Sequence, residues 1–362
     1  MVKIQLFIIL LILIIFLYIV YRMIQKHVAK YSLFEGFETD AVKNLDKQNQ
    51  TSPAITNITD NMNNIPLNQV CIKASYNSAF DGKEISTDML EYVMSRGCRF
   101  LDFELYLDGE SVYVNYSTDP TFSTFENTNT NDSTNGVLFS SIMTYIIGTG
   151  SGKAPNPKDP LFIHLRIKSD SPTKSNSPTI YTKIFDVLKT SDVLKTSDVY
   201  KDQINGNTNL IDLKEKIIIA MDRSIRPNDE IGNLADYVSV FTGGSTWSID
   251  RYSEFKNQKT SPPKPNDDFK TTNVNQLKLA LPDLEKSSPN PASPFDFITN
   301  YGVQTIACRF YKNDIFNDLC EDIFAEHQSA FVPLGYVLNY IKRQKEDPRP
   351  RKLKYGPNII HE

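Results

Sequence analysis

The sequence predicts a parallel α/β sheet or barrel that follows a single transmembrane helix. Short runs rich in β-branched and aromatic residues recur along the chain, helix-like stretches separate several of them, and an uncharged apolar run stands near the N-terminus. The number of strand-like runs favours a barrel. The 362 residues carry a formal net charge of -4 and are 40% hydrophobic, which is typical of a globular protein with a sizeable core.

The apolar run from Leu6 to Tyr21 contains no charged residue, and Lys3 and Arg22 flank it. Because flanking cations can reach the lipid headgroups, residues 4–24 are long enough for a membrane-spanning helix of about 20 residues. A cleaved signal peptide is the alternative, but the apolar core is long and lacks a small-x-small cleavage site. We therefore predict an uncleaved, single-pass anchor.

The charges around the span favour the cytoplasmic side for the rest of the chain. Arg22, Lys26 and Lys30 follow the span, whereas only Lys3 and the amino terminus precede it. Four N-glycosylation sequons would suit the opposite topology, although an Asn-rich chain forms such triplets by chance; they begin at Asn49, Asn57, Asn115 and Asn131. Four cysteines without metal-ligand or disulfide-framework spacing suit buried thiols in a reducing compartment: Cys71, Cys98, Cys308 and Cys320.

A polar linker rich in Asn, Thr and Asp is expected over residues 25–68, with the globular part beginning near Gln69. Helix-like stretches at 86–96 and 136–150 alternate with strand-like runs. A Pro-rich break at 256–275 divides the domain into two sequence halves. The strand-like runs lie at 70–76, 100–107, 112–117, 161–168, 216–222, 237–243 and 303–310.

Residues 341–362 form a basic tail. Seven lysines and arginines crowd residues 342–354, against only Glu346 and Asp347. Such a tail can bind anionic lipid or nucleic acid, and a merely solvated tail is the alternative.

Two acids stand in an otherwise apolar strand-like run. Asp102 and Glu104 are two residues apart in "RFLDFELYL", so their side chains share one face of the strand. Carboxylates in such a run need a partner, unless the strand is exposed and carries both acids into water. The pair is therefore a candidate metal site or the remnant of one.

Four motifs, in this order, resemble the catalytic barrel of phosphoinositide-specific phospholipase C. "KASYNSAF" (73–80) resembles the family's Ser-His-Asn-Thr motif, and "GCRFLDFELY" (97–106) resembles its Gly-Cys-Arg strand with two acids. "LKEKIII" (213–219) resembles a later strand, and "SSPNPASPFDFITNYGVQTIACRF" (287–310) resembles the signature of the second half. The resemblance divides the domain into an X-like half, 69–255, and a Y-like half, 276–340.

The resemblance implies a TIM-like (β/α)8 barrel of the PLC-like phosphodiesterase type, with its site at the carboxyl ends of the strands. In the family, one histidine acts as base on the inositol 2-hydroxyl and a second acts as acid for the leaving oxygen. Calcium, held by an asparagine and carboxylates, offsets charge on the phosphoryl group.

Both proton-transfer positions of the family carry other residues in this chain. The first histidine falls on Tyr76, and the second falls on Asn115 or Tyr116. Tyrosine, with an ordinary pKa of about 10, is a poor base at neutral pH, and asparagine cannot transfer a proton as imidazole does. The resemblance therefore implies a barrel that has lost its acid and its base.

The family's metal positions are kept only in part. Its calcium ligands correspond to Asn77, Asp102 and Glu104, whereas a further carboxylate position falls on Arg166. A guanidinium there would oppose a divalent cation and could pair with both acids. Positions that bind substrate phosphates and the headgroup fall on non-basic residues, Ala220, Asp222 and Leu279. We expect no cofactor, with calcium as the alternative.

The four histidines allow the acid–base question to be checked completely. His27 abuts the predicted span, and His361 lies at the C-terminal end. His164 would lie two residues before Arg166 on the same inward strand face, and His327 is expected in a loop. Retained hydrolysis would require a rewired pair of His164 and His327, whereas a packed His164 with an exposed His327 is the alternative.

We predict a membrane-anchored, catalytically inactive phospholipase C-like barrel that acts as a binding or structural module. One alternative is an active calcium-dependent or rewired phosphoric diester hydrolase that acts on lipid. Another is an architectural protein that links a membrane to a protein shell such as a virus capsid, since the Ile-, Lys- and Asn-rich composition is typical of AT-rich genomes of protists and large DNA viruses. The expected partners are the membrane, through residues 4–24, and anionic lipid, through the basic tail.

Overall fold

The computed structural model describes residues 54–118, 135–168, 177–190, 199–257 and 276–347, together with Gln5, Tyr18, Val42 and Leu45. The chain divides into two units, Met1–Thr39 and Asp40–Glu362. In the first unit, Gln5 and Tyr18 are helical and exposed. The rest of the predicted span, and the basic tail beyond Asp347, lie outside the described residues. In the part that is described, no helix combines the length and the apolar character needed to cross a membrane.

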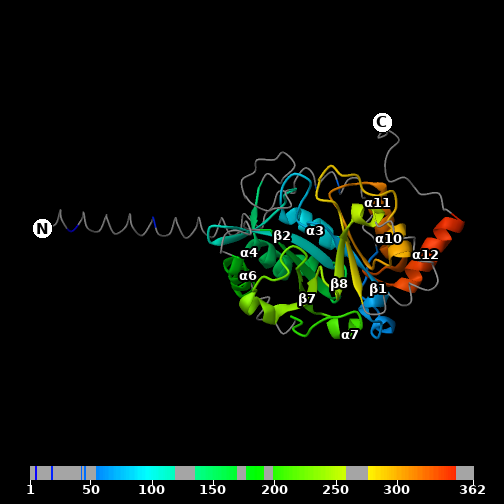
Figure 1. Ribbon diagram of the computed structural model, residues 1–362, viewed down its shortest axis with the longest axis horizontal. Helices are drawn as coiled ribbons and strands as arrows, with labels where there is room; N and C mark the ends of the chain where they lie inside the picture. The colour runs from blue at the N-terminus through cyan, green and yellow to red at the C-terminus, as the bar shows by residue number, and fades with distance from the viewer. Residues whose placement is uncertain are drawn as a thin grey trace. The chain divides into compact units, whose positions relative to one another are not determined.

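Eight parallel strands of the second unit close into a barrel (Figure 1). Each strand pairs with the next around the ring, and β1 pairs with both β10 and β2, which closes the circle. This confirms the predicted barrel. In order around the ring, its strands are β1 (Val70–Ser75), β2 (Phe100–Asp108), β5 (Leu161–Ile167), β6 (Ile217–Asp222), β7 (Val238–Thr242), β8 (Trp247–Arg251), β9 (Leu277–Leu281) and β10 (Thr305–Cys308).

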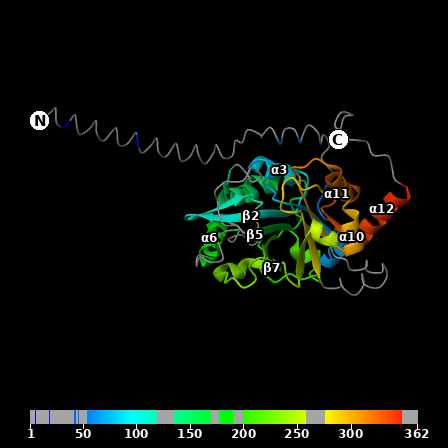
Figure 2. The ribbon, with the colours of Figure 1, turned by 45° about the horizontal axis from the view of Figure 1, so that its top comes forward.

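Helices follow the strands around the outside of the barrel. Figures 1 and 2 both show α10, α11 and α12 together on one side and α6 on the opposite side. The helices are α3 (Thr87–Ser95), α4 (Phe139–Tyr145), α5 (Ser151–Lys153), α6 (Ser177–Thr190), α7 (Leu210–Leu213), α8 (Tyr252–Asn257), α10 (Phe295–Tyr301), α11 (Ile315–His327) and α12 (Leu334–Glu346). Antiparallel strands β3 (Ser111–Asn115), β4 (Val137–Leu138) and β11 (Phe331–Pro333) extend the sheet, with a π-helical turn η3 (Ile146–Gly150) and 3-10 turns η1 (Asp60–Met62), η2 (Leu67–Gln69) and η4 (Gly232–Tyr237).

The sequence patterns missed two barrel strands. β8 and β9 are each five residues long, flank the Pro-rich break, and carry polar residues, as in "WSIDR" and "LKLAL". Short strands with interspersed polar residues give little periodicity, so only pairing in the ring identifies them. The stretch 136–150 begins as strand β4 before α4 starts at Phe139, and α12 runs to Glu346, beyond the predicted end of the Y-like half at 340.

The predicted linker is partly wrong, because its last third belongs to the folded domain. Ile55, Ile58, Met62 and Leu67 are buried against the core, although polar residues surround them in the sequence. The backbone N–H of Ile58 also donates to the Asp159 carboxylate at 2.7 Å. The domain therefore begins by residue 54, since burying a few well-spaced apolar side chains is enough to order an otherwise polar segment.

Alternate side chains of β2 and β5 point into the barrel. The strand register pairs Phe100 with Phe162, Asp102 with His164, and Glu104 with Arg166, so each pair lies at one level. Phe100 and Phe162 contact Trp247 at ring-centroid distances of 5.7 and 5.8 Å. These aromatic rings close the amino-end half of the barrel with apolar packing. The polar pairs lie in the carboxyl-end half, where barrels of this kind carry their sites.

Candidate functional site

Charged side chains fill the carboxyl-end half of the barrel. We define the interior cluster as Asp102 and Glu104 of β2, Arg166 of β5, and Lys168 directly after β5. The exposed fraction of each is between 0 and 1%. The parallel register of β2 and β5 brings them together, because inward side chains at the same level of adjacent strands are neighbours.

Arg166 lies between the two carboxylates. Its Nε and Nη2 donate to Asp102 Oδ1 and Oδ2, both at 2.7 Å, and its Nη1 donates to Glu104 Oε1 at 2.7 Å. The guanidinium also lies 4.7 Å from the centroid of the Tyr76 ring. The contact expected between Arg166 and both acids is present, in the forked geometry that a guanidinium provides.

Asn77 completes this arrangement. Its backbone N–H donates to Asp102 Oδ2 at 3.0 Å, its Nδ2 donates to Glu104 Oε1 at 3.3 Å, and its Oδ1 accepts from Arg166 at 3.1 Å. Asn77 has a φ of 44°, a left-handed conformation that asparagine tolerates better than most residues and that turns its N–H towards Asp102. The three residues predicted as metal ligands therefore converge on one point, and the guanidinium of Arg166 occupies it.

The second oxygen of Glu104 has partners of its own. Oε2 lies 3.2 Å from Lys168 Nζ and accepts from the Tyr106 hydroxyl at 3.2 Å and the Ser117 N–H at 3.3 Å. Lys168 in turn donates to the Ser117 carbonyl oxygen at 3.2 Å. Every carboxylate oxygen of the interior cluster thus has a donor from the protein, as buried charges require.

The interior cluster carries no net charge, because two carboxylates face two cations. Burial alone would raise the pKa of Asp102, but Arg166 and His164 outweigh burial and hold that pKa well below its usual range. The pKa of Glu104 is also lowered, because Lys168 and Arg166 together outweigh burial. Burial lowers the pKa of Lys168 to about 8 despite the attraction of Glu104. At neutral pH the cluster is ionised and neutralises itself.

These residues do not fit a calcium ion. Calcium takes six to eight oxygen ligands and is favoured by surplus negative charge. Here the carboxylate oxygens already point at cations, and Arg166 occupies the point on which they converge. Across the described residues, no group of three or more His, Cys, Asp or Glu side chains is arranged to hold a metal.

Thr242, which the sequence patterns did not single out, completes a hydrogen-bonded chain inside the barrel. His164 Nδ1 lies 2.8 Å from Asp102 Oδ1, and His164 Nε2 lies 2.7 Å from Thr242 Oγ1. This connectivity of carboxylate, imidazole and hydroxyl is that of a nucleophilic triad. All three side chains have an exposed fraction of 0%, so the hydroxyl faces packed protein and the chain positions these groups without reaching a substrate.

His327 does not meet His164. It is the last residue of helix α11 and not a loop residue as predicted, and its ring stacks on Tyr336 of α12 at 5.6 Å. The next residue, Gln328, accepts through its carbonyl from the N–H of Thr56, and Ile58 donates to Asp159, two residues before the start of β5. His327 therefore lies towards the amino ends of the strands, away from the interior cluster. Both nitrogens of His164 are bonded elsewhere, so the rewired pair is not formed.

Tyr76, Asn115 and Tyr116, at the family's histidine positions, lie over the interior cluster. The Tyr76 hydroxyl is 3.5 Å from Glu104 Oε1, and Asn115 lies opposite Glu104 in the β2–β3 ladder. The Asn115 Oδ1 accepts from the N–H of Tyr116 at 2.8 Å. The Tyr116 ring stacks on Phe80 at 4.4 Å, and burial raises its pKa well above the usual range. These side chains are packed and poorly suited to proton transfer.

A loop after β9 lies beside Tyr116 at the carboxyl ends of the strands. Four side chains from other elements bond to its backbone carbonyls. Tyr116 donates to the Leu284 carbonyl at 2.7 Å, and Arg251 of β8 donates to the Pro282 carbonyl at 2.7 Å. The Ser288 carbonyl accepts from Arg309 at 2.7 Å and from Lys312 at 2.6 Å. The loop is thereby fixed at the carboxyl ends of the strands.

The positions at which the family binds substrate phosphates and the headgroup carry no positive charge here. Ala220 and Leu279 are completely buried. Asp222 is half-buried, and its carboxylate accepts from the N–H of Ser224 at 2.7 Å. None of the three offers a donor to an anionic ligand.

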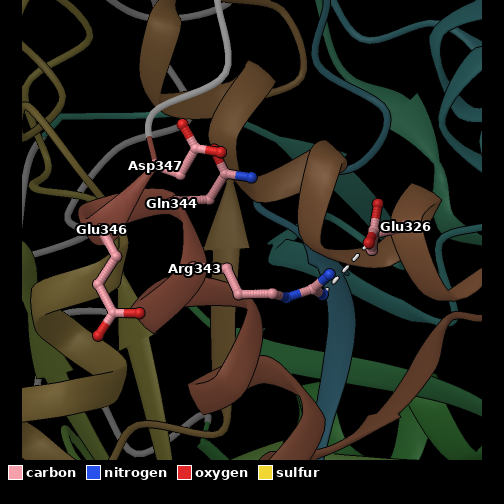
Figure 3. Close-up of a pocket in the computed structure, with 5 residues that line it drawn as sticks. All are labelled: Glu326, Arg343, Gln344, Glu346 and Asp347. Atoms are coloured by element: carbon pink, nitrogen blue, oxygen red, sulfur yellow. Dashed lines mark hydrogen bonds and ion pairs between the residues drawn. The ribbon is translucent and has the colours of Figure 1, made fainter.

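A surface pocket lies outside the barrel, between the last turns of α11 and α12 (Figure 3). Arg343 Nη2 lies 3.2 Å from Glu326 Oε1 across it. The other lining residues are Gln344, Glu346 and Asp347. The pocket shares no residue with the interior cluster.

No protein-family model matches the sequence, and no curated protein matches it. Solved structures do match. PLC21 of L. pealei aligns with a TM-score of 0.54 and 14% identity, over 75% of this chain and 37% of that chain. PLC21 of S. officinalis aligns with a TM-score of 0.55 and 14% identity over the same shares. A calcium-dependent phosphoinositol-specific phospholipase C of a Pseudomonas species aligns with a TM-score of 0.45 and 13% identity, over 78% of this chain and 100% of that chain.

The comparison shows that this barrel has the fold of the barrels in the two PLC21 structures. At 14% identity the likeness shows the fold alone. This chain spans 37% of the length of the two PLC21 chains.

Proposed function

We propose that this protein is a catalytically inactive phospholipase C-like barrel, tethered to a membrane, that serves as a binding or structural module. The observation that carries the proposal is the position of Arg166. Its guanidinium bonds to Asp102, Glu104 and Asn77, at the point on which these three residues converge. A fixed cation there supplies internally the charge compensation that a metal would otherwise provide.

The groups around the interior cluster support the same proposal. A phosphodiester cleavage that forms a cyclic product needs one group to accept a proton and another to donate one. Tyr76, Asn115 and Tyr116 are packed in hydrogen bonds or ring contacts, and His164 is bonded at both nitrogens. The exposed fractions of these four side chains lie between 0 and 4%, so in the part of the chain that the structure describes they are closed to a lipid headgroup.

The membrane tether and the contact with anionic lipid belong to the proposal as well. The apolar run from Leu6 to Tyr21 supports a span, and the lysines and arginines of residues 342–354 support a lipid-facing tail. An anchor would hold the module at the membrane surface without any contribution from the barrel.

The test is the release of inositol phosphate by the purified full chain in mixed micelles that contain phosphatidylinositol, with calcium or with a chelator. We expect release at background, because losing each proton-transfer group typically costs at least about 100-fold in rate. Calcium-dependent release that Asn77→Ala abolishes, while the exposed control Asn61→Ala does not, would overturn the proposal. Release that His164→Ala abolishes, without a calcium requirement, would establish a rewired hydrolase instead.

A further inference from the structure

One N-glycosylation sequon of this chain is folded into the barrel. Asn115, Tyr116 and Ser117 form the triplet, and their exposed fractions are 4, 0 and 9%. The backbone of Ser117 bonds to two members of the interior cluster. Its N–H donates to Glu104 at 3.3 Å, and its carbonyl accepts from Lys168 at 3.2 Å. The triplet therefore contacts two buried charged side chains directly through its backbone.

Glycosylation at this triplet is incompatible with that closure. Transfer joins Asn Nδ2 to the anomeric carbon of a lipid-pyrophosphate-linked sugar, and it releases the lipid pyrophosphate and one amide proton. The bulky product must remain in water. Asn115 has an exposed fraction of 4% and Tyr116 of 0%, so the packed interior leaves no room for a glycan there. Glu104 and Lys168 would then lose the backbone groups that satisfy them, which is costly for buried charges.

A second sequon shows the contrast. Asn57 is half-buried at the edge of the domain, and its Oδ1 accepts from the N–H of Lys158 at 2.9 Å. Among the described residues its Nδ2 makes no hydrogen bond, so a glycan there leaves the packing intact. Asn49 and Asn131 lie outside the described residues. A glycosylating compartment would thus tolerate the triplet at 57 but would damage the fold through the triplet at 115.

The cysteines also favour a compartment without N-glycosylation. All four cysteines are free and buried, and none of them forms a disulfide. Cys308 of β10 and Cys320 of α11 are both buried and are separate thiols. Free thiol pairs persist where glutathione and thioredoxin keep them reduced, and such compartments also lack N-glycosylation.

We propose that the barrel folds and resides on the side of its membrane that carries out no N-glycosylation, because the triplet at Asn115 must stay unmodified for the interior cluster to close. The inference depends on the buried triplet and not on whether the barrel is inactive. For the proposed module, it specifies the compartment of the barrel. Partners that bind the barrel must therefore be present on the reducing side of the membrane.

The test places an added acceptor triplet at either end of the full chain, expressed in eukaryotic cells. One version carries it on an N-terminal extension long enough to clear the membrane, and the other carries it after Glu362. We expect a shift with peptide N-glycosidase for the N-terminal acceptor only, and no glycan on the unextended chain. A glycosylated C-terminal acceptor or a glycan on the barrel would overturn the proposal, and Thr59→Ala and Ser117→Ala would identify which triplet carries it.

Two further outcomes separate this inference from the proposed function. Without modification at either end, the membrane tether would be wrong, whereas the compartment inference would hold. A barrel glycosylated at Asn115 that keeps the trypsin resistance of the Ser117→Ala variant would refute the steric argument itself. Neither outcome bears on whether the barrel cleaves phosphatidylinositol.

Discussion

Two buried groups of charges in this molecule look alike but connect different parts of it. The interior cluster joins β2 to β5, which are adjacent strands already paired by backbone bonds. The outer cluster, which we define as Lys73, Arg96 and Glu321, joins β1, the C-cap of α3 and α11. Lys73 Nζ lies 2.8 Å from Glu321 Oε1, and Arg96 Nε donates to Glu321 Oε2 at 2.7 Å.

The difference shows which buried charges the architecture needs. The outer cluster ties helices α3 and α11 to strand β1 of the barrel through side chains. Helices share no backbone ladder with a strand, so side-chain contacts of this kind hold them to the barrel. The interior cluster adds bonds between strands that the sheet already holds. Burial and pairing are therefore similar in both clusters, and what distinguishes them is their position in the fold, between the helices and the barrel or at the carboxyl ends of the strands. A buried ion pair at the carboxyl end of a barrel is better explained by the chemistry that barrels place there.

The largest effect is expected from Arg166→Ala, which leaves Glu104 paired with Lys168 and leaves Asp102 without its guanidinium partner. We expect the free energy of unfolding to fall by about 3 kcal/mol, the scale for removing one partner of a buried pair. Calcium should restore part of this loss in the variant only, because it would bind the folded state. Urea unfolding of the full chain, followed by fluorescence of Trp247, the single tryptophan, measures both effects.

A neutral version of the interior cluster is the matched control. Adding Asp102→Asn and Glu104→Gln to Arg166→Ala removes the unpaired charges, so part of the lost stability should return and the response to calcium should disappear. If the wild-type protein gains stability from calcium while Arg166→Ala costs little without it, the acids still bind a metal and the proposed function fails.

A smaller effect is expected from Glu321→Gln in the outer cluster. The change leaves Lys73 and Arg96 without a counter-charge but keeps the volume and one acceptor, so the loss should be about 2 kcal/mol. Calcium should have no effect on this variant, because no second acid is present to bind it. Glu346→Gln removes an exposed pair at 3.8 Å from Lys342 and should change stability by less than about 0.5 kcal/mol. If Glu321→Gln and Glu346→Gln lower the free energy of unfolding equally, the outer cluster has no structural role.

The difference in stability between the wild type and Glu321→Gln should also depend on pH. Burial raises the pKa of Glu321, but Lys73 and Arg96 outweigh burial and lower that pKa to about 2. A carboxyl whose pKa is lowered in the folded state contributes stability above its ordinary pKa and loses it as the pH falls. The stability gap between wild type and Glu321→Gln should therefore close between about pH 5 and pH 2. A gap that stays constant down to pH 2 would show that the carboxylate is not stabilised by its two cations.

Local patterns in the sequence were sufficient for the class of fold and for the strands that carry the cluster. The runs at 100–107 and 161–168 correspond to β2 and β5, because nine- and seven-residue strands rich in apolar residues have a strong signal. Spacing by two residues also placed Asp102 with Glu104, and His164 with Arg166, on shared faces. Those conclusions need only the periodicity of a strand.

Contacts between distant segments were decided by tertiary structure. Thr242 bonds to His164 across 78 positions, and the Leu284 carbonyl accepts from Tyr116 across 168, so no local pattern could pair them. The burial of Ile55 and Met62 and the position of His327 at the far end of α11 depend likewise on packing. Strand periodicity states which way a side chain points, but only closure of the ring sets what it meets, because closure fixes the register and neighbours of all eight strands together.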